Sequence, residues 1–170
     1  MRHILANRMN NSTIANNRWN PTTSCAGALQ IQVEGALVAC YGNVITGNVL
    51  SGAYTYEAME LIDFSYGVVS NNYINIPVST DHTQAIALAH QDGGPQLKSK
   101  AAFNTITGNV INIVSPTGST KAAGISLYPW LTSLSLGPDD NVVSGNTIHI
   151  SGLASSAVCT FANTNRTVFK

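Results

Sequence analysis

Four titratable side chains have the types and spacing that acid–base chemistry on a sugar would need. Glu60, Asp63, His90 and Asp92 are the candidate catalytic residues. Hydrolysis of a glycosidic bond uses two carboxyl groups about 5 to 10 Å apart, so Glu60 or Asp63 could pair with Asp92. His90 could instead be the base of a lyase that removes a proton beside a uronate carboxyl group. Acidic side chains on a protein surface are most often only solvated, and that interpretation stays open for all four.

Aromatic and amide side chains near these residues are candidates for binding a substrate. Tyr128 and Trp130 offer flat apolar faces on which sugar rings could stack, and Gln30 and Gln91 offer amide groups. Trp130 follows Pro129 and could equally cover the edge of a core. A second cluster lies at the other end of the same strands and contains Tyr54, Tyr56, Glu57, Asp81 and His82.

We expect no metal ion or other cofactor. The three cysteines, Cys25, Cys40 and Cys159, do not form a cluster with metal-ligand spacing, and their odd number argues against a disulfide framework. The sequence also lacks the group of Asp residues that is typical of a calcium site. The thiols are therefore interpreted as buried or idle.

An eight-residue repeat provides the framework that must position these side chains. Its clearest copy is NVITGNVL at residues 43–50, and further copies cover residues 12–19, 67–74, 104–111 and 141–148. The third position is always Ile or Val, the fifth is Gly or Asn, and the sixth is always Asn. A position open only to Gly and Asn predicts a backbone with φ > 0. The five predicted bends are at Asn16, Gly47, Asn71, Gly108 and Gly145.

The Asn that follows each bend should lie above the equivalent Asn of the neighbouring repeat. The strands on either side of a bend are too short to pair with each other, so they should pair in parallel with the same strands of the next repeat. A side-chain amide has two donors and one carbonyl acceptor, so stacked amides can pass hydrogen bonds along the axis. The predicted stack is Asn17, Asn48, Asn72, Asn109 and Asn146.

A shorter repeat alternates with the first and predicts a third strand in each coil. It reads small, apolar, variable, apolar at residues 28–31, 58–61, 85–88 and 124–127, with a fifth copy at 157–160. This period of two indicates a strand with one buried face. The variable position should point outward, which gives an outer row of Gln30, Glu60, Ala87 and Ser126.

Together the two repeats predict one all-β domain over residues 1–170. We expect a solenoid of about five coils with three strands in each. Solenoids need terminal caps, and neither end of the sequence shows an amphipathic capping helix. We therefore expect uncapped ends and a segment of a longer protein or assembly.

Composition limits the possible partners. The formal net charge is zero, charged residues are 9% of the chain, and no basic patch stands out, so nucleic acid is not expected. Asn, Ser and Thr number 18, 16 and 16, which is typical of extracellular β-proteins. No apolar run reaches about 18 residues, so membrane insertion is not expected. The first residues also lack the long apolar stretch of a signal peptide.

The alternation of Gly/Ala-Ile-x-Leu with Asn-x-Ile-x-Gly-Asn-x-Ile over residues 3–160 resembles the right-handed parallel β-helix family. Pectate lyases belong to this family, as do the tailspike and tail-fibre depolymerases of bacteriophages, and the pattern looks most like the polysaccharide-processing branch. The resemblance implies a single-stranded right-handed β-helix with sugar bound along its outer face, and phage members are commonly homotrimers. Because scaffold residues carry it, the resemblance is specific for fold and not for reaction.

These observations favour a tailspike-like domain that binds bacterial surface polysaccharide and could cleave it as a hydrolase or lyase. One alternative is a non-catalytic structural or receptor-binding segment of a phage tail fibre. Another is a secreted polysaccharide lyase or epimerase. The expected location is a virion tail or the extracellular space, and enzymatic activity stays open.

Overall fold

A computed structural model describes residues 2–7, 9–21, 25–32, 40–77, 83–90, 101–115, 123–129, 138–152, 157–161 and 166–170. Within these ranges every regular element is a β-strand, and no helix occurs. The all-β prediction is therefore confirmed for the described part of the chain. No helix in that part is long and apolar enough to cross a membrane.

The strands form three large sheets and one small sheet. The first sheet contains, in spatial order, β1 (Arg2–Asn7), β4 (Gly27–Gln32), β8 (Glu57–Ile62), β12 (Gln84–His90), β15 (Ala123–Pro129) and β18 (Ala157–Phe161). The second contains β2 (Thr13–Ala15), β6 (Val44–Thr46), β10 (Val68–Ser70), β13 (Thr105–Thr107), β16 (Val142–Ser144) and β19 (Val168–Phe169). The third contains β3 (Arg18–Trp19), β7 (Val49–Ser51), β11 (Tyr73–Ile76), β14 (Val110–Ser115) and β17 (Thr147–Gly152). The small sheet pairs β5 (Cys40–Tyr41) with β9 (Phe64–Ser65).

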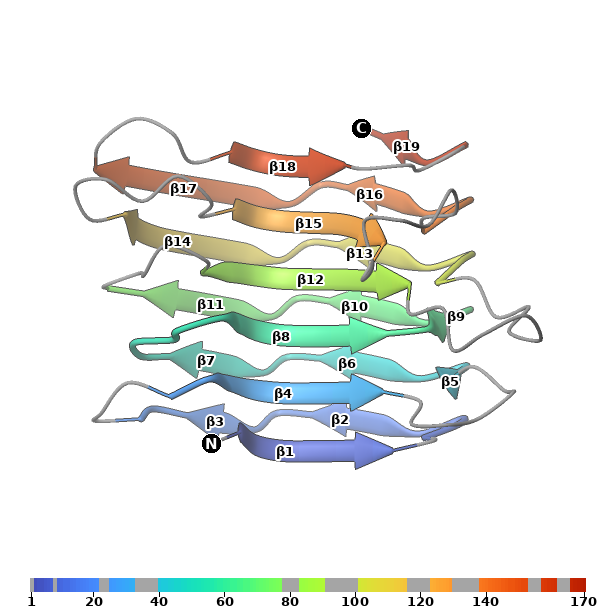
Figure 1. Cartoon of the computed structure of the whole chain (residues 1–170), viewed down its shortest axis with the longest axis horizontal. Coiled ribbons are helices and arrows are strands. Elements are labelled where there is room, and N and C mark those ends of the chain that lie inside the picture. Colours follow the sequence, from blue (N-terminus) through green and yellow to red (C-terminus); the bar gives the residue numbers. More distant parts are fainter. Residues whose placement is uncertain are drawn as a thin grey trace.

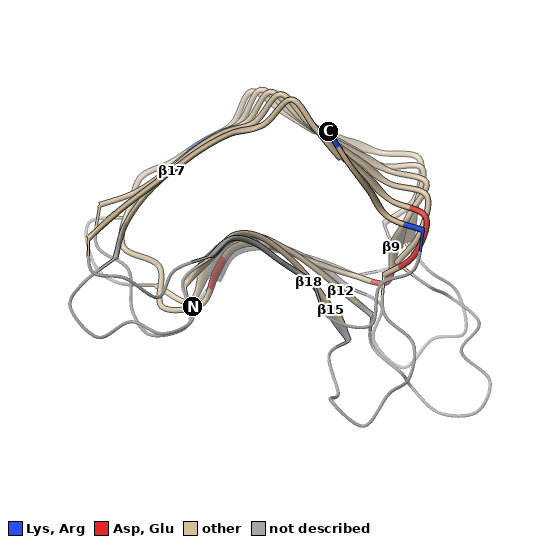
Figure 2. Ribbon diagram, turned by 90° about the horizontal axis from the view of Figure 1, so that it is seen from above, with Lys and Arg blue, Asp and Glu red and all other residues tan. Residues whose placement is uncertain are grey.

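The chain visits the large sheets in a fixed order, and every strand pairing is parallel. It runs from the second sheet through a bend to the third, then to the first, and returns to the second sheet one strand further along. We call one such passage a circuit. Figure 1 shows the circuits as layers from β1 to β19, and Figure 2, which looks along the stack, shows the strands of each sheet superimposed.

The predicted bends between the second and third sheets are confirmed. All five residues have positive φ: Asn16 58°, Gly47 65°, Asn71 54°, Gly108 65° and Gly145 60°. Space as well as conformation favours glycine at Gly108, because a Cβ there would lie 2.7 Å from Asn71 Oδ1 of the preceding circuit.

The predicted asparagine stack is also confirmed. Nδ2 of each Asn donates to Oδ1 of the next, at 3.1, 3.0, 3.0 and 2.9 Å along the series Asn17, Asn48, Asn72, Asn109 and Asn146. Each Oδ1 also accepts the backbone N–H of the preceding Asn at 3.0 Å. From Asn48 onward, the second Nδ2 donor binds a backbone carbonyl of the preceding circuit. The amides therefore connect the circuits and saturate the polar backbone at the bends.

A second asparagine stack lies at the start of the second sheet and was not predicted. Asn104 donates from Nδ2 to Asn141 Oδ1 at 2.9 Å, and Asn43 accepts the Ser12 N–H at 3.0 Å. The equivalent position between Asn43 and Asn104 is Gly67, and a Cβ there would clash with the ring of Phe64. The stack is interrupted at Gly67 because the buried Phe64 ring occupies the space of a side chain. The sequence signal was the Asn at the first position of three repeats.

Apolar side chains from all three large sheets fill the interior. The fully buried rows include Ile45 and Ile106 from the second sheet, Leu50 and Ile74 from the third, and Met59, Ile86 and Ile125 from the first. Outward side chains of the second sheet are mostly half-buried, and those of the third are half-buried or exposed. The core therefore lies inside the ring of sheets seen in Figure 2.

The first-sheet repeat is confirmed in four copies and wrong by one residue in the fifth. Leu29, Met59, Ile86 and Ile125 are in register on neighbouring strands. On β18, however, Cys159 and not Val158 pairs with Ile125. The repeat therefore covers residues 158–161, and the pattern alone could not decide because both residues are apolar.

Candidate functional site

The predicted outer row of the first sheet is in register. Gln30 pairs with Glu60, Glu60 with Ala87, and Ala87 with Ser126. Neighbouring strands are about 4.8 Å apart. The row therefore presents an amide, a carboxyl, a methyl and a hydroxyl group in sequence along the stack.

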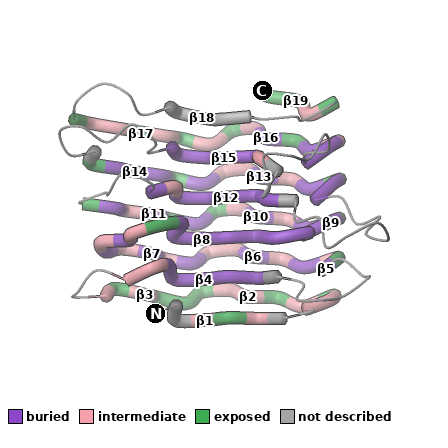
Figure 3. Tube along the Cα trace, in the orientation of Figure 1, coloured by how far each residue is buried: buried purple, intermediate pink, exposed green. Residues whose placement is uncertain are grey.

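The expectation that this row forms an open surface is wrong. Glu60 is 0% exposed, and Gln30 and Ser126 are also buried. The other outward positions of β8 and β12 are apolar and equally buried: Ala58, Ile62, Ala85 and Ala89. Figure 3 shows β8 and most of β4, β12 and β15 as buried. The continuous apolar run at residues 85–89 of β12 was the available signal, because such a run marks a parallel strand that is buried on both faces.

Glu57 joins this face through a hydrogen bond from a predicted binding residue. Tyr128 Oη donates to Glu57 Oε1 at 3.4 Å across the intervening strand β12. Ile125 and Leu127 belong to the core, so Tyr128 lies on the outward side of β15. The bond therefore draws the Glu57 carboxyl group to the outer face. Glu57 is only 9% exposed.

Gln84 extends the polar group onto β12. It pairs in register with Glu57, and its Oε1 atom is buried with no hydrogen-bond partner among the described residues. A buried carbonyl oxygen without a donor costs about 1–3 kcal/mol. The strand next to β8 therefore carries a buried carbonyl oxygen that has no donor among the described residues.

Glu57 and Glu60 are the two carboxyl groups that this face brings together. They are three positions apart on β8, which corresponds to about 10 Å between Cα atoms. Both have further polar or electrostatic interactions within the fold. The arrangement can accept hydrogen bonds from hydroxyl groups.

Asp63 has a role at a corner of the backbone. Its φ is 51° and its side chain is buried. Its N–H donates to the Ala89 carbonyl at 2.9 Å, and its carbonyl accepts the Cys40 N–H at 3.1 Å. Asp tolerates this left-handed conformation better than most residues. The turn between β8 and β9 therefore accounts for an Asp at position 63.

The remaining predicted site residues are not placed by the structure. Gln91, Asp92 and Trp130 lie outside the described residues, and so do Asp81 and His82 of the second cluster. His90 ends β12, and only its backbone is described. The proposed pairing of Glu60 or Asp63 with Asp92, and the base role of His90, therefore stay predictions.

The described members of the second predicted cluster differ in burial. Tyr56 is exposed, whereas Tyr54 is fully buried and its hydroxyl has no hydrogen-bond partner among the described residues. Burial raises the pKa of Tyr54, and the negative charge of the neighbouring Cys25, when that thiol is ionised, adds to the rise. Burial likewise raises the pKa of Cys25. Tyr54 and Cys25 pair across a bridge between circuits, so they are structural in this arrangement.

No family model, curated protein or solved structure matches the chain. The site is therefore interpreted from its own geometry. Within the described residues, no group of three or more His, Cys, Asp and Glu side chains could hold a metal ion. The polar groups available on the first sheet are amide, hydroxyl and carboxyl groups, which suit a hydroxyl-rich ligand.

Proposed function

We propose that the chain is a right-handed single-stranded parallel β-helix of about five coils from a tailspike-like protein, and that it binds bacterial surface polysaccharide. The parallel sheets and the asparagine stack support the fold. The winding sense is supported by Figure 1, where the front strands run to the right, the strands behind them run to the left, and successive circuits rise. A virion tail or the extracellular space is the proposed location.

One observation carries the binding proposal: polar side chains persist on a covered face whose other residues are Ala and Ile. Burial of polar and charged groups costs free energy even when they are paired, and Ala87 shows that the row accepts a methyl group. Departures from an apolar interior are expected where binding or catalysis uses them. Gln30, Glu60 and Ser126, with Glu57 and Tyr128, form that group.

A linear, neutral and hydroxyl-rich polymer fits this group best. The polar positions recur on β4, β8 and β15, so they follow the stack direction over several circuits. Amide, hydroxyl and carboxyl oxygens accept hydrogen bonds from sugar hydroxyls. The formal net charge is zero and charged residues are 9% of the chain, so few cationic side chains are available to bind a polyanion.

A non-catalytic binding segment is the second candidate, and the burial of the carboxyl groups favours it. A general acid must reach the proton it transfers within hydrogen-bond distance. Glu60 is 0% exposed and Glu57 is 9% exposed. Cleavage by these carboxyl groups and sugar contact with Glu60 both therefore require that the sugar reach a face that is covered in the free protein.

Binding and cleavage can be separated in one set of experiments. The full chain is titrated with purified capsular polysaccharides and O-antigens by calorimetry, and the mixtures are then assayed for new reducing ends and for absorbance of unsaturated uronate. We expect Glu60→Gln and Tyr128→Phe to weaken binding about tenfold, which is about 1.4 kcal/mol. Asn75→Ala, on the third sheet, is the matched control.

Two outcomes would count against the proposal. Binding of no surface polysaccharide by the wild-type chain would reject it outright, and wild-type affinity in both first-sheet variants would reject the site. Thermal unfolding of each variant shows whether a loss of binding reflects a loss of fold. Sedimentation of the free chain tests the accompanying proposal of a homotrimer.

A further inference from the structure

A second column of left-handed residues runs along the corner where the second sheet begins. Each member lies two residues before a strand of that sheet, and the column comprises Asn11, Gly42, Tyr66, Phe103, Asp140 and Arg166, with φ from 47° to 66°. Backbone bonds repeat along it, as from the Tyr66 N–H to the Ala102 carbonyl at 2.9 Å. The bonding between circuits therefore holds this conformation whatever the residue type.

Tyr66 and Phe103 are unusual in such a column. A side chain with a Cβ disfavours the left-handed region, and bulky residues are rarely found there. Gly42 shows that the column accepts glycine, which has no such strain. Backbone strain of this kind is concentrated at functional sites. We therefore expect the two aromatic residues to have a function beyond supporting the fold.

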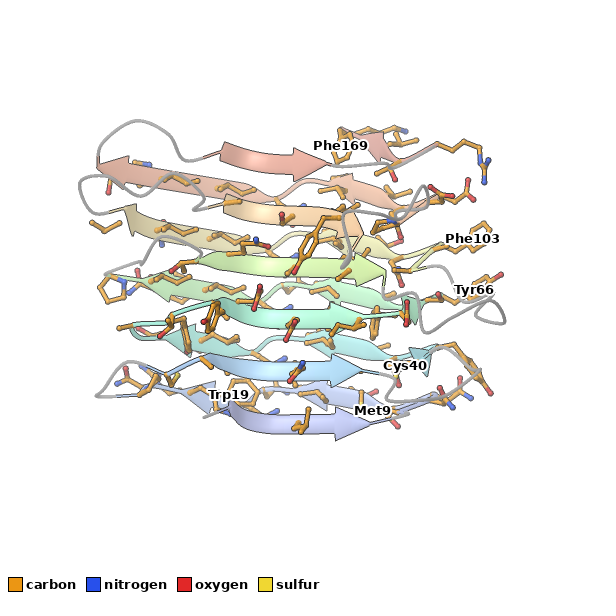
Figure 4. The ribbon with its side chains drawn as sticks, in the orientation of Figure 1. Met9, Trp19, Cys40, Tyr66, Phe103 and Phe169 are labelled. Carbon is orange, nitrogen blue, oxygen red and sulfur yellow. The ribbon has the colours of Figure 1, made fainter. Side chains whose placement is uncertain are left out.

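The two rings form an exposed stacked pair. Their centroids are 4.9 Å apart and their planes differ by 16°. Tyr66 is 64% exposed and Phe103 is 51% exposed. Figure 4 shows both side chains pointing away from the sheets at the same edge of the molecule. Since their separation matches the spacing of about 4.8 Å between strands, the rings are held in place by the stack of circuits.

By themselves the two rings are too small for a stable protein interface. With about 200 Å² of side-chain surface per aromatic residue, the exposed parts of the two rings amount to roughly 200 Å². A stable interface needs about 800 Å² from each partner. A patch of two rings instead matches a small ligand with a flat apolar face, such as a nucleic-acid base or a pyranose ring.

The next two members of the column decide between these ligands. Arg166 Nη2 donates to Asp140 Oδ2 at 2.6 Å, so the one cation of this column, all of whose members the structure describes, is paired with a carboxylate. Nucleic-acid binding depends on free cations that neutralise phosphates. A neutral sugar needs no free cation, and its hydroxyl groups can bond to both members of an exposed ion pair.

We propose that Tyr66 and Phe103 form a stacking platform for the pyranose rings of a neutral glycan chain that lies along the strand-stacking direction. Asp140 and Arg166 bind hydroxyl groups of the next sugar in the chain. This inference rests on the proposed polysaccharide binding. It adds a second site, which is aromatic and exposed, whereas the first-sheet row is polar and covered. The platform is exposed, so it meets a polymer without any movement of the fold.

Glycine substitutions test the platform, because they remove the rings and relieve the strain together. The double variant Tyr66→Gly/Phe103→Gly is titrated by calorimetry with the surface polysaccharide that binds the wild-type chain most tightly. We expect about tenfold weaker binding, which is about 1.4 kcal/mol, with no loss of thermal stability. Tyr66→Phe, which keeps the ring, should bind within about twofold of the wild type, a difference well under 1 kcal/mol.

The outcomes distinguish this inference from the proposed function. Unchanged affinity in the double glycine variant, with binding still sensitive to Glu60→Gln, would overturn the platform and leave the proposed function standing. Absence of any polysaccharide binding by the wild-type chain would overturn both. Tyr73→Ala removes an exposed ring from the third sheet, and a loss of binding equal to that of the double variant would show a non-specific effect and reject the platform.

Discussion

The asparagine stack should contribute measurably to stability, and Asn72 is the residue that tests it best. Its side chain lies in the middle of the stack and makes four hydrogen bonds. Oδ1 accepts from Asn48 N and Nδ2, and Nδ2 donates to the Ile45 carbonyl and to Asn109 Oδ1, all at 3.0 Å. Asn72→Ala removes all four.

The consequences differ for each partner. Asn48 Nδ2 keeps its bond to the Ile14 carbonyl, and Asn109 Oδ1 keeps the Asn72 N–H. The Asn48 N–H loses its side-chain acceptor while Asn48 itself is 0% exposed. A buried donor that is left without an acceptor costs about 1–3 kcal/mol, and each of the other three lost hydrogen bonds costs about 1 kcal/mol. We therefore expect Asn72→Ala to lower the free energy of unfolding by about 5 kcal/mol, or Tm by roughly 15 °C.

Asn17→Ala is the matched control at the exposed end of the same stack. Asn17 Nδ2 donates to the Ala15 carbonyl and to Asn48 Oδ1, both at 3.1 Å. Water can replace these bonds, so the expected loss is below about 1 kcal/mol. Urea unfolding of the full chain, followed by circular dichroism, measures both variants.

Asn72→Asp separates the hydrogen bonds from the shape of the side chain. A carboxylate keeps the size of the amide but loses both donors, and it would face the Ile45 carbonyl and Asn109 Oδ1. We expect Asn72→Asp to be at least as unstable as Asn72→Ala at neutral pH. If both Asn72 variants were as stable as Asn17→Ala, the stacked amides would not stabilise the fold and the reasoning would be refuted.

Other predictions concern a buried hydroxyl and a glycine. Tyr54→Phe should raise the free energy of unfolding by about 1 kcal/mol, because the hydroxyl is buried and has no hydrogen-bond partner in the described part of the chain. Tyr56→Phe should change nothing measurable. Because burial raises the pKa of Tyr54 above its ordinary value of 10.0, the unfolded chain loses this proton first as pH rises. Stability should therefore fall above about pH 10, less steeply in Tyr54→Phe than in the wild type, and parallel pH profiles would contradict this. Gly67→Ala should lower the free energy of unfolding by about 3 kcal/mol through the clash with Phe64. The control Gly145→Ala, where a Cβ has room but φ is positive, should lower it by about 1 kcal/mol. Equal losses of stability in thermal unfolding would show that space at Gly67 does not matter.

The site was only partly predictable. The alternation of residues correctly placed Gln30, Glu60 and Ser126 in one row, because the side-chain period of a strand is local. The same pattern could not show that the row is buried, because the alternation along a strand gives the direction of a side chain and not what lies above it. By the alternation of side chains along β8, Glu57 should point inward. Only the hydrogen bond from Tyr128, 71 residues away in the sequence, assigns its carboxyl group to the outer face.

The sequence by itself determined the bends and the asparagine stack. A left-handed backbone selects Gly or Asn, as at Gly47 and Asn71, and a repeated side-chain amide bonds to its own copy wherever the strands are parallel. Only the tertiary structure decided the second left-handed column, because Tyr66 and Phe103 have no local preference for positive φ. Their conformation is imposed by backbone bonds between circuits, and the same constraint creates the stacked rings that we propose as a glycan platform.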